Sequence, residues 1–261
     1  MKVVLFAGGL GTRLRDYDEN VPKPMVTIGY RPIMWHLMKY YAHHGHKDFI
    51  LCLGYKADVV KKYFLEYNEA VSNNFVLAEG GHKIQLLNSD IHDWRITFVD
   101  TGISTPIGER LRRVREHLAG EKTFLANYTD CLSDLDLNAY VGHFCASGKT
   151  AAMVTVPPNV SFHYVATDGE LVKSLTDVRA TQLRVNGGFF IFRQEFFDYL
   201  EEGEELVDGP FHRLIEREQL LAYPYNGFWR AMDTFKDKQA LDELLARGAP
   251  PWEVWNRPAA K

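Results

Sequence analysis

A glycine-rich loop directly after an apolar segment most constrains what this chain can fold into. Residues 2–7, Lys-Val-Val-Leu-Phe-Ala, have the length and composition of a short buried strand. The loop that follows, residues 8–13, reads Gly-Gly-Leu-Gly-Thr-Arg. Because glycine has no Cβ, backbone N–H groups in such a loop can approach a phosphate chain closely. The start of the chain therefore predicts a nucleotide-binding protein.

A second motif, Pro-Lys-Pro-Met at residues 22–25, follows the loop after a short spacer. Arg13 and Lys23 add positive charge of the kind that offsets the charge of a triphosphate. The dinucleotide pattern G-x-G-x-x-G fails, because its third glycine position holds Leu14, and no Walker sequence G-x-x-x-x-G-K-[ST] occurs. The glycines alone fit a tight strand-to-helix turn equally well, so the prediction depends on the two motifs together.

The two motifs resemble the signature of the sugar nucleotidyltransferase family, G-G-x-G-T-R-L followed by P-K-P-M. Further blocks follow in that family's order as far as Trp255, over nearly the whole chain. The F-W-x-x-M-D-T block and the closing Pro-Trp-Glu-Val-Trp are most similar to the glucose-1-phosphate cytidylyltransferase branch. The intervening blocks are residues 100–102, 108–111, 128–130, 185–190 and 227–234.

The order of apolar and amphipathic segments predicts the fold class. Short apolar runs alternate with longer amphipathic stretches, the pattern of βαβ units around a parallel sheet. We therefore predict an α/β fold with a mixed, mostly parallel sheet, and the resemblance implies a Rossmann-like nucleotidyltransferase architecture. Residues 1–261 are treated as a single domain, with a nucleotide-binding half over 1–156. Residues 157–261 form the acceptor-binding and C-terminal half, with a small β-rich portion, and residues 68–93 predict a polar, aperiodic excursion.

Composition excludes several classes of protein. A formal net charge of −4 provides no overall attraction for nucleic acid or anionic membranes. No apolar run approaches the roughly 20 residues of a membrane-spanning helix, and no signal segment opens the sequence. Three cysteines without a pattern fit a reducing cytoplasm better than a disulfide scaffold. We predict a cytoplasmic protein without nucleic-acid or membrane partners, and the resemblance implies a homo-oligomer.

Two aspartates are the candidate metal ligands. Asp130 follows an apolar segment, residues 123–128, at the kind of strand end where parallel-sheet sites commonly lie. Asp233 belongs to the F-W-x-x-M-D-T block. The resemblance implies that this pair holds the metal, and Mg²⁺ suits nucleotidyl transfer because it bridges phosphates with only one or two protein carboxylates. Taken singly, each aspartate fits a helix cap or a surface charge more simply.

The resemblance also implies the contacts to the nucleotide. Arg13 is expected to bind the departing pyrophosphate, and Lys23 to reach the α-phosphate or the acceptor phosphate, with Asp130 completing the catalytic set. Asp100 is the candidate reader of cytosine, because a carboxylate complements the N4 amine, and its alternative role is to cap the next turn. The expected nucleotide-binding residues are Gly8, Gly9, Gly11, Thr12, Arg13, Asp100, Gly108 and Thr129.

The acceptor side holds the main departure from the family. The family usually carries a Glu-Lys-Pro segment whose lysine grips the sugar phosphate, and residues 171–180 lack that triplet. Arg179 is the candidate replacement, with Asp177 and Lys173 as alternatives. Lys23 is expected on the acceptor phosphate and Asn186 on a sugar hydroxyl. The expected partners are therefore CTP or another NTP and a phosphorylated small-molecule acceptor.

The sequence thus predicts an enzyme that transfers CMP from CTP to a sugar 1-phosphate, first of all glucose 1-phosphate, and releases pyrophosphate with Mg²⁺ as cofactor. One alternative is a nucleotidyltransferase with another sugar phosphate or a non-sugar phosphate or phosphonate acceptor. The other is a nucleotide-sensing module that has lost turnover.

Two smaller expectations concern charged side chains near the predicted site. Asp134 is expected to cap the helix that follows it, and Asp136 to be a solvated surface charge. A basic helical segment is expected to present a solvated face, although Arg110 can approach the nucleotide. Its arginines are Arg110, Arg112, Arg113 and Arg115.

Overall fold

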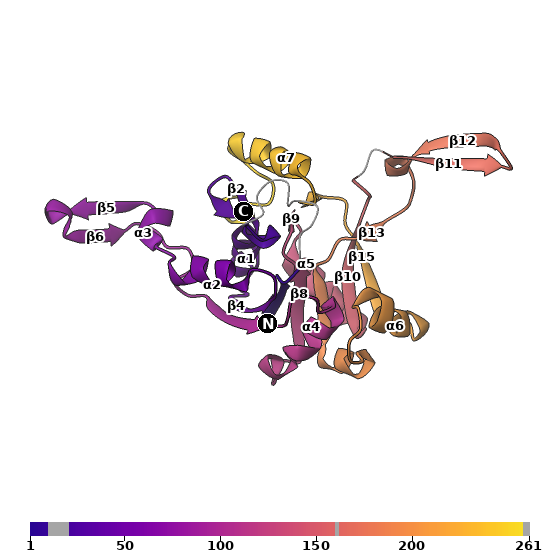
Figure 1. The fold of residues 1–261 in the computed structure, drawn as a ribbon, viewed down its shortest axis with the longest axis horizontal. Coiled ribbons are helices and arrows are strands. Elements are labelled where there is room, and N and C mark those ends of the chain that lie inside the picture. The colour runs from indigo at the N-terminus through magenta and orange to yellow at the C-terminus, as the bar shows by residue number, and fades with distance from the viewer. Residues whose placement is uncertain (10–20, 160–161, 258–261) are drawn as a thin grey trace.

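A mixed eight-stranded sheet organises the described part of the chain, which comprises residues 1–9, 21–159 and 162–257 of a computed structural model (Figure 1). Its strand order is β13-β10-β14-β8-β1-β4-β7, with β15 paired to β10. The pairs β1–β4, β1–β8, β4–β7 and β10–β15 are parallel, and β8–β14, β10–β13 and β10–β14 are antiparallel. The predicted mixed, mostly parallel α/β fold is thereby confirmed. The strands are β1 (Val3–Phe6), β4 (Asp48–Leu53), β7 (Arg95–Asp100), β8 (Thr123–Tyr128), β10 (Ala151–Val156), β13 (Val185–Asn186), β14 (Phe190–Arg193) and β15 (Leu220–Pro224).

Helices cover both faces of this sheet. Successive side chains of a strand point to opposite faces, so Val3 and Leu5 of β1 enter one core and Val4 and Phe6 enter the other. The first core is completed by α1, α5 and α7, and the second by α4 and α6. The helices are α1 (Ile33–His43), α2 (Ala57–Leu65), α3 (Glu69–Ser72), α4 (Ile107–Arg113), α5 (Leu137–Ser147), α6 (His212–Glu216) and α7 (Phe235–Ala246).

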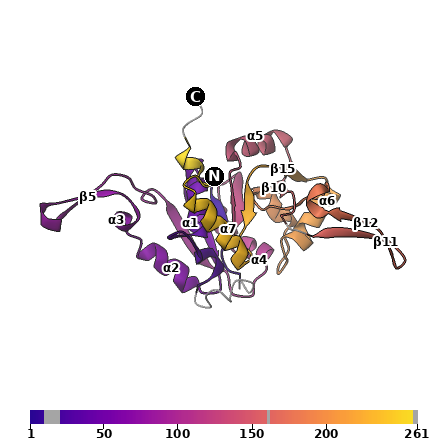
Figure 2. The same cartoon turned by 90° about the horizontal axis from the view of Figure 1, so that it is seen from above.

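Two hairpins extend from opposite sides of the molecule (Figures 1 and 2). One consists of β5 (Phe75–Ala78) and β6 (Lys83–Leu86), and the other of β11 (His163–Asp168) and β12 (Leu171–Asp177). The segment predicted as an aperiodic excursion therefore contains α3 and a regular hairpin. Its strands were missed because their apolar side chains are exposed and do not follow the pattern of a half-buried strand.

Strands from both predicted halves of the chain meet in the sheet. β10, which ends the predicted nucleotide-binding half, pairs with three strands from the second half. The division into two halves stays a prediction. Cys52, Cys131 and Cys145 are free, and none of the described helices is long and apolar enough to span a membrane.

Candidate active site

A short two-stranded ribbon brings the two candidate metal ligands together. Asp130 lies just beyond β8 and directly before β9 (Cys131–Ser133), and Asp233 follows β16 (Trp229–Ala231) closely. β9 and β16 pair in antiparallel register, with Cys131 opposite Ala231. The Met232 N–H extends this pairing by donating to the Asp130 carbonyl at 2.8 Å. Two aspartates far apart in the sequence therefore leave the same end of one ribbon.

Lys23 lies between these two carboxylates. Its Nζ is 2.5 Å from Asp130 Oδ2 and 2.7 Å from Asp233 Oδ1. The lysine begins a 3₁₀ turn, Lys23–Met25, whose Pro24 and Met25 are buried, so the backbone that carries it is anchored in the protein. Three predicted site residues from three separate motifs are thus in direct contact.

The electrostatics of this cluster keep Lys23 charged. Burial alone lowers the pKa of Lys23, but the charges and hydrogen bonds of Asp130 and Asp233 outweigh burial, and the pKa is raised above 10.5. The two carboxylates therefore already converge on a cation. In the described residues, this cluster included, no group of three or more His, Cys, Asp or Glu side chains is arranged for a metal. Two carboxylates suit Mg²⁺ in a phosphate-transfer site, because substrate phosphates and water complete its oxygen ligands.

The first glycine of the predicted phosphate loop contacts a buried arginine. Gly8 follows β1, and its carbonyl accepts a hydrogen bond from Arg110 Nη2 at 3.1 Å. A Cβ at Gly8 would lie 2.0 Å from Arg110 Nη1, so the guanidinium requires glycine here. Gly9 is exposed, and a Cβ there would meet no other described atom within 4 Å. Gly11, Thr12 and Arg13 lie outside the described residues.

Arg110 is buried and does not belong to the solvated basic face that was expected. It is only 2% exposed, and its guanidinium bonds to the strand-end loops after β1, β4 and β7. Nη1 donates to the Leu53 carbonyl at 3.1 Å and to Thr101 Oγ1 at 2.7 Å, and Nη2 also donates to the Ile103 carbonyl at 3.0 Å. The expectation was wrong for this residue because helical spacing does not reveal which charged side chain turns inward.

The other predicted nucleotide contacts have local structural roles as well. Asp100 ends β7, and its Oδ1 accepts from the Gly102 N–H at 3.0 Å, the turn-capping role considered for it. Gly108 packs in the first turn of α4, where a Cβ would lie 2.6 Å from the Glu204 carbonyl. Thr129 is buried, and its hydroxyl donates to the Phe6 carbonyl at 3.1 Å. Contact of these three residues with a nucleotide stays a prediction.

The two candidate acceptor residues lie in different surroundings. Asn186 Oδ1 accepts from the Gly188 N–H at 2.9 Å, in a loop packed against the end of β8. Arg179 lies at the base of the β11–β12 hairpin, where its Nε is 3.0 Å from Asp177 Oδ1 and its Nη2 is 2.5 Å from Asp177 Oδ2. The charge of Arg179 is therefore balanced by a neighbour.

Neither of the two aspartates that follow β9 has its expected role. Asp136 is the N-cap of α5, with its Oδ1 3.0 Å from the Ala139 N–H. Asp134 instead joins the open end of the ribbon. Its Oδ1 accepts from the Phe228 N–H at 2.8 Å and from the Tyr225 hydroxyl, and its Oδ2 accepts from Arg257 Nη2 at 3.0 Å. The sequence carried no signal for these contacts, because all three partners lie in the last quarter of the chain.

Comparison with known proteins identifies the family. The model of the nucleotidyl transferase family matches residues 2–237. The chain belongs to the nucleotidyl transferase family. It is an enzyme of the class that the two N-terminal motifs predicted, and the predicted family resemblance is confirmed.

Among curated relatives, the chain is 38% identical to glucose-1-phosphate cytidylyltransferase of Salmonella typhi, over 98% of this chain and 100% of the relative. It is 33% identical to a probable glucose-1-phosphate cytidylyltransferase of Bacillus subtilis, with the same coverage.

Solved structures share the fold at lower identity. A putative glucose-1-phosphate thymidylyltransferase from Bacillus anthracis superimposes with a TM-score of 0.66 at 16% identity, over 95% of this chain and 96% of that one. A UDP-glucose pyrophosphorylase superimposes with a TM-score of 0.69 at 14% identity, over 94% of this chain and 98% of that one. At these identities the likeness concerns the fold alone.

Proposed function

We propose that this enzyme transfers CMP from CTP to glucose 1-phosphate, forming CDP-glucose and pyrophosphate. The observation that supports the chemistry most directly is the convergence of Asp130, Lys23 and Asp233 at one strand end. The preference for CTP and glucose 1-phosphate rests on the full-length relatives that carry this name. A phosphate oxygen of the acceptor attacks the α-phosphorus, and the bond to the bridging oxygen of the β-phosphate breaks as pyrophosphate leaves.

The proposed metal is Mg²⁺, held by Asp130 and Asp233. When bound, the ion supplies positive charge to the phosphate oxygens as the pyrophosphate departs. Lys23 then moves from between the carboxylates to the α-phosphate or the acceptor phosphate. Its ammonium is suited to this role because its raised pKa keeps it protonated across the physiological range. Arg13, Gly11 and Thr12 remain our candidates for the triphosphate.

Base and sugar selection are assigned to residues around the strand ends. Asp100 is proposed to accept the cytosine amine, since one of its carboxylate oxygens is engaged by Gly102 and the second can bind the base. Gly8, Gly9, Gly108 and Thr129 are proposed as further contacts to the nucleotide. Asn186 is proposed to bind a sugar hydroxyl through its amide nitrogen, because its Oδ1 is taken by the Gly188 N–H.

A second candidate function keeps the chemistry and changes the acceptor. The contact between Arg179 and Asp177 favours it, because a guanidinium already paired with a carboxylate binds an acceptor phosphate less strongly. In this reading the acceptor is another sugar phosphate or a non-sugar phosphate or phosphonate. The alternative of a silent sensing module is not favoured, since the lysine and both carboxylates are retained in contact.

We also propose that the enzyme is a cytoplasmic homo-oligomer. Free cysteines support a reducing compartment. The two hairpins support self-association, because isolated two-stranded hairpins are only marginally stable in water and these expose large apolar side chains. Leu77 of β5 is 58% exposed, and Leu175 of β12 is 66% exposed. Sedimentation of the purified protein tests this directly, and a monomer at micromolar concentration would contradict it.

The function is tested by pyrophosphate release with Mg²⁺, crossing CTP, UTP, dTTP, ATP and GTP with sugar 1-phosphates and small phosphonates. We expect release with CTP and glucose 1-phosphate, and release with another acceptor alone would support the second candidate. Asp233→Asn should abolish release. Asp93→Asn is the matched control, because it removes a carboxylate from an exposed pair with Lys47. Equal loss in both variants would contradict the metal assignment, and silence with every acceptor would favour the sensing module.

A further inference from the structure

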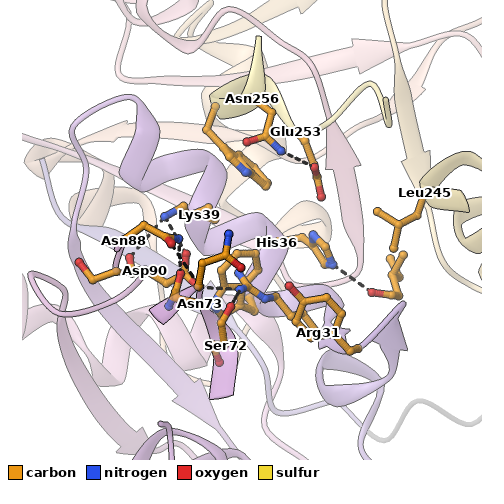
Figure 3. Close-up of a pocket in the computed structure, with 16 residues that line it drawn as sticks. Arg31, His36, Lys39, Ser72, Asn73, Asn88, Asp90, Leu245, Glu253 and Asn256 are labelled. Atoms are coloured by element: carbon orange, nitrogen blue, oxygen red, sulfur yellow. Dashed lines mark hydrogen bonds and ion pairs between the residues drawn. The ribbon is translucent and has the colours of Figure 1, made fainter. Parts of the chain in front are cut away.

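A polar cavity of about 430 Å³ lies against α1, and none of the proposed catalytic residues lines it (Figure 3). Its volume falls in the range of small-molecule sites, roughly 300–1,000 Å³. Segments distant in the sequence form its walls, and Figure 3 shows Glu253 and Asn256 above the opening, with Arg31 and Ser72 below. The lining segments are 28–39, 72–74, 88–90 and 245–256.

The walls of this cavity are held in place without a ligand. The Asp90 carboxylate is 2.7 Å from Arg31 Nη2 and 3.2 Å from Lys39 Nζ, and it accepts from the Tyr67 hydroxyl at 3.1 Å. Arg31 also donates to the Ser72 carbonyl at 2.5 Å, and its guanidinium carbon lies 3.7 Å from the centre of the Trp35 ring. A site fixed in this way loses little conformational entropy when a ligand enters.

A second set of contacts orients the amide groups on the rim. Asn88 Nδ2 donates to Asn73 Oδ1 at 2.6 Å, and Asn88 Oδ1 accepts from the Asn74 N–H at 3.2 Å. Asn73 is in turn held by Glu69 through its own amide nitrogen at 2.6 Å. The two rim segments before β5 and after β6 are therefore joined by side-chain amides.

The charges around the cavity balance one another. Arg31 and Lys39 are both bound to Asp90, so a phosphate would have to compete with that carboxylate for them. The remaining acid, Glu253, has a pKa raised by burial, and its Oε2 accepts from Asn256 Nδ2 at 2.7 Å. The charges of the four charged side chains in the lining sum to zero when Glu253 is ionised. These side chains are Arg31, Lys39, Asp90 and Glu253. The cavity therefore favours a ligand without a strong charge.

The rest of the lining is mainly amide, hydroxyl and aromatic, with His36 and the aliphatic side chains of Ile28 and Leu245. Asparagine and serine side chains both donate and accept hydrogen bonds, which matches hydroxyl groups on the edge of a sugar ring. Tyr30, which is 73% exposed, and Trp255 add aromatic faces that can cover the C–H faces of such a ring. The ring of Trp255 is held edge-on to Trp35, with 6.2 Å between the centroids. We propose that this cavity binds the ring of a neutral saccharide.

The proposal places a second carbohydrate site on the enzyme, separate from that of the phosphorylated acceptor. It does not depend on the metal assignment or on the identity of the nucleotide. A saccharide bound here touches the segments at the base of the β5–β6 hairpin as well as α1.

The test is titration of the full-length protein with D-glucose and with maltose, followed by ligand-observed NMR and by tryptophan fluorescence. We expect saturable binding with a dissociation constant on the order of 1 mM. Tyr30→Ala should weaken it about tenfold, the effect of losing one stacking face. Tyr164→Ala is the matched control, because Tyr164 is also exposed, at 58%, but lies on β11. Asp233→Asn and Asn186→Ala should both leave sugar binding intact, which separates this site from the proposed metal and acceptor sites.

Three results would overturn the proposal. One is the absence of saturable binding up to about 50 mM sugar, well above the expected dissociation constant. The second is binding that Tyr30→Ala leaves unchanged, which would locate the sugar elsewhere. The third is displacement of the sugar by inorganic phosphate in the Asp233→Asn variant, which would identify an anion site.

Discussion

Asp134 is predicted to set the separation of the two metal-ligand candidates, although it contacts neither of them. It closes one end of the β9–β16 ribbon by binding the Phe228 N–H, the Tyr225 hydroxyl and Arg257. Asp130 and Asp233 leave the other end of the same ribbon. Replacing Asp134 with alanine removes all three side-chain contacts and leaves the strand pairing and the hydrogen bond from the Ser133 hydroxyl to the Phe228 carbonyl at 2.8 Å.

The expected magnitude follows from these contacts. A hydrogen bond to a charged acceptor contributes about 1.5–3 kcal/mol. The Asp134 side chain is 21% exposed, and Tyr225 and Arg257 can turn toward water when it is lost. The half-buried Phe228 N–H cannot turn, so we expect Asp134→Ala to cost about 2 kcal/mol of unfolding free energy. Since a shift of about 1 Å in a catalytic group can cost about 100-fold in rate, kcat should fall by about 10- to 100-fold.

The assay is pyrophosphate release at saturating CTP and acceptor, measured against Mg²⁺ concentration, together with urea unfolding. In Asp134→Ala the Mg²⁺ concentration for half-maximal rate should rise, because the two ligands are no longer held in register. Asp134→Asn, which keeps an acceptor for the Phe228 N–H, should recover most of the rate. Asp136→Ala is the control, because loss of the α5 cap costs about 1 kcal/mol without touching the ribbon.

The reasoning would be refuted by either of two results. One is an unchanged Mg²⁺ requirement in Asp134→Ala despite the loss of stability. The other is a shift of the same size in Asp136→Ala, which would show that any destabilisation nearby has this effect.

Three further predictions concern the loop glycines and two titrating groups. Gly8→Ala puts a Cβ 2.0 Å from the Arg110 guanidinium, so urea unfolding should show a loss of about 2 kcal/mol or more, whereas Gly9→Ala should be neutral. The pKa of Lys23 is raised above 10.5, so the stabilisation that its charge gives the fold is complete below that pH and is lost as pH rises through the folded-state pKa. The free energy of unfolding of Lys23→Met should not show this loss at alkaline pH. Identical dependence on alkaline pH in the two proteins would contradict the reasoning. The Arg112 hydrogen bond lowers the pKa of Glu109 from 4.5 to about 2. The stabilisation that the ionised Glu109 gives the fold is therefore present above pH 4.5 and is lost toward pH 2. In Glu109→Gln the free energy of unfolding should therefore fall less steeply between pH 4.5 and pH 2. An unchanged pH dependence in this range would contradict a stabilising role of this ion pair.

Features that depend on neighbours along the chain could be predicted from the sequence. The strand before Gly8, the alternation of strands and helices, and the two family motifs all rest on local order, and the fold class and the family are confirmed. Lys23, Asp130 and Asp233 were chosen from short motifs, and they are in contact in the structure. Their roles with substrate and metal stay predictions.

Only the tertiary structure decided which charged side chains are buried and which groups they bind. Arg110 was expected on a solvated helix face or near the nucleotide, and Asp134 at a helix end, because helical spacing and sequence proximity to α5 indicate only local roles. In the fold, Arg110 joins three strand-end loops, and Asp134 joins β9 to a segment from the last quarter of the chain. These partners become neighbours only when the parallel strands align and the β9–β16 ribbon forms. The sequence by itself therefore determined the class of fold and the chemical groups of the site, and long-range strand pairing determined their geometry.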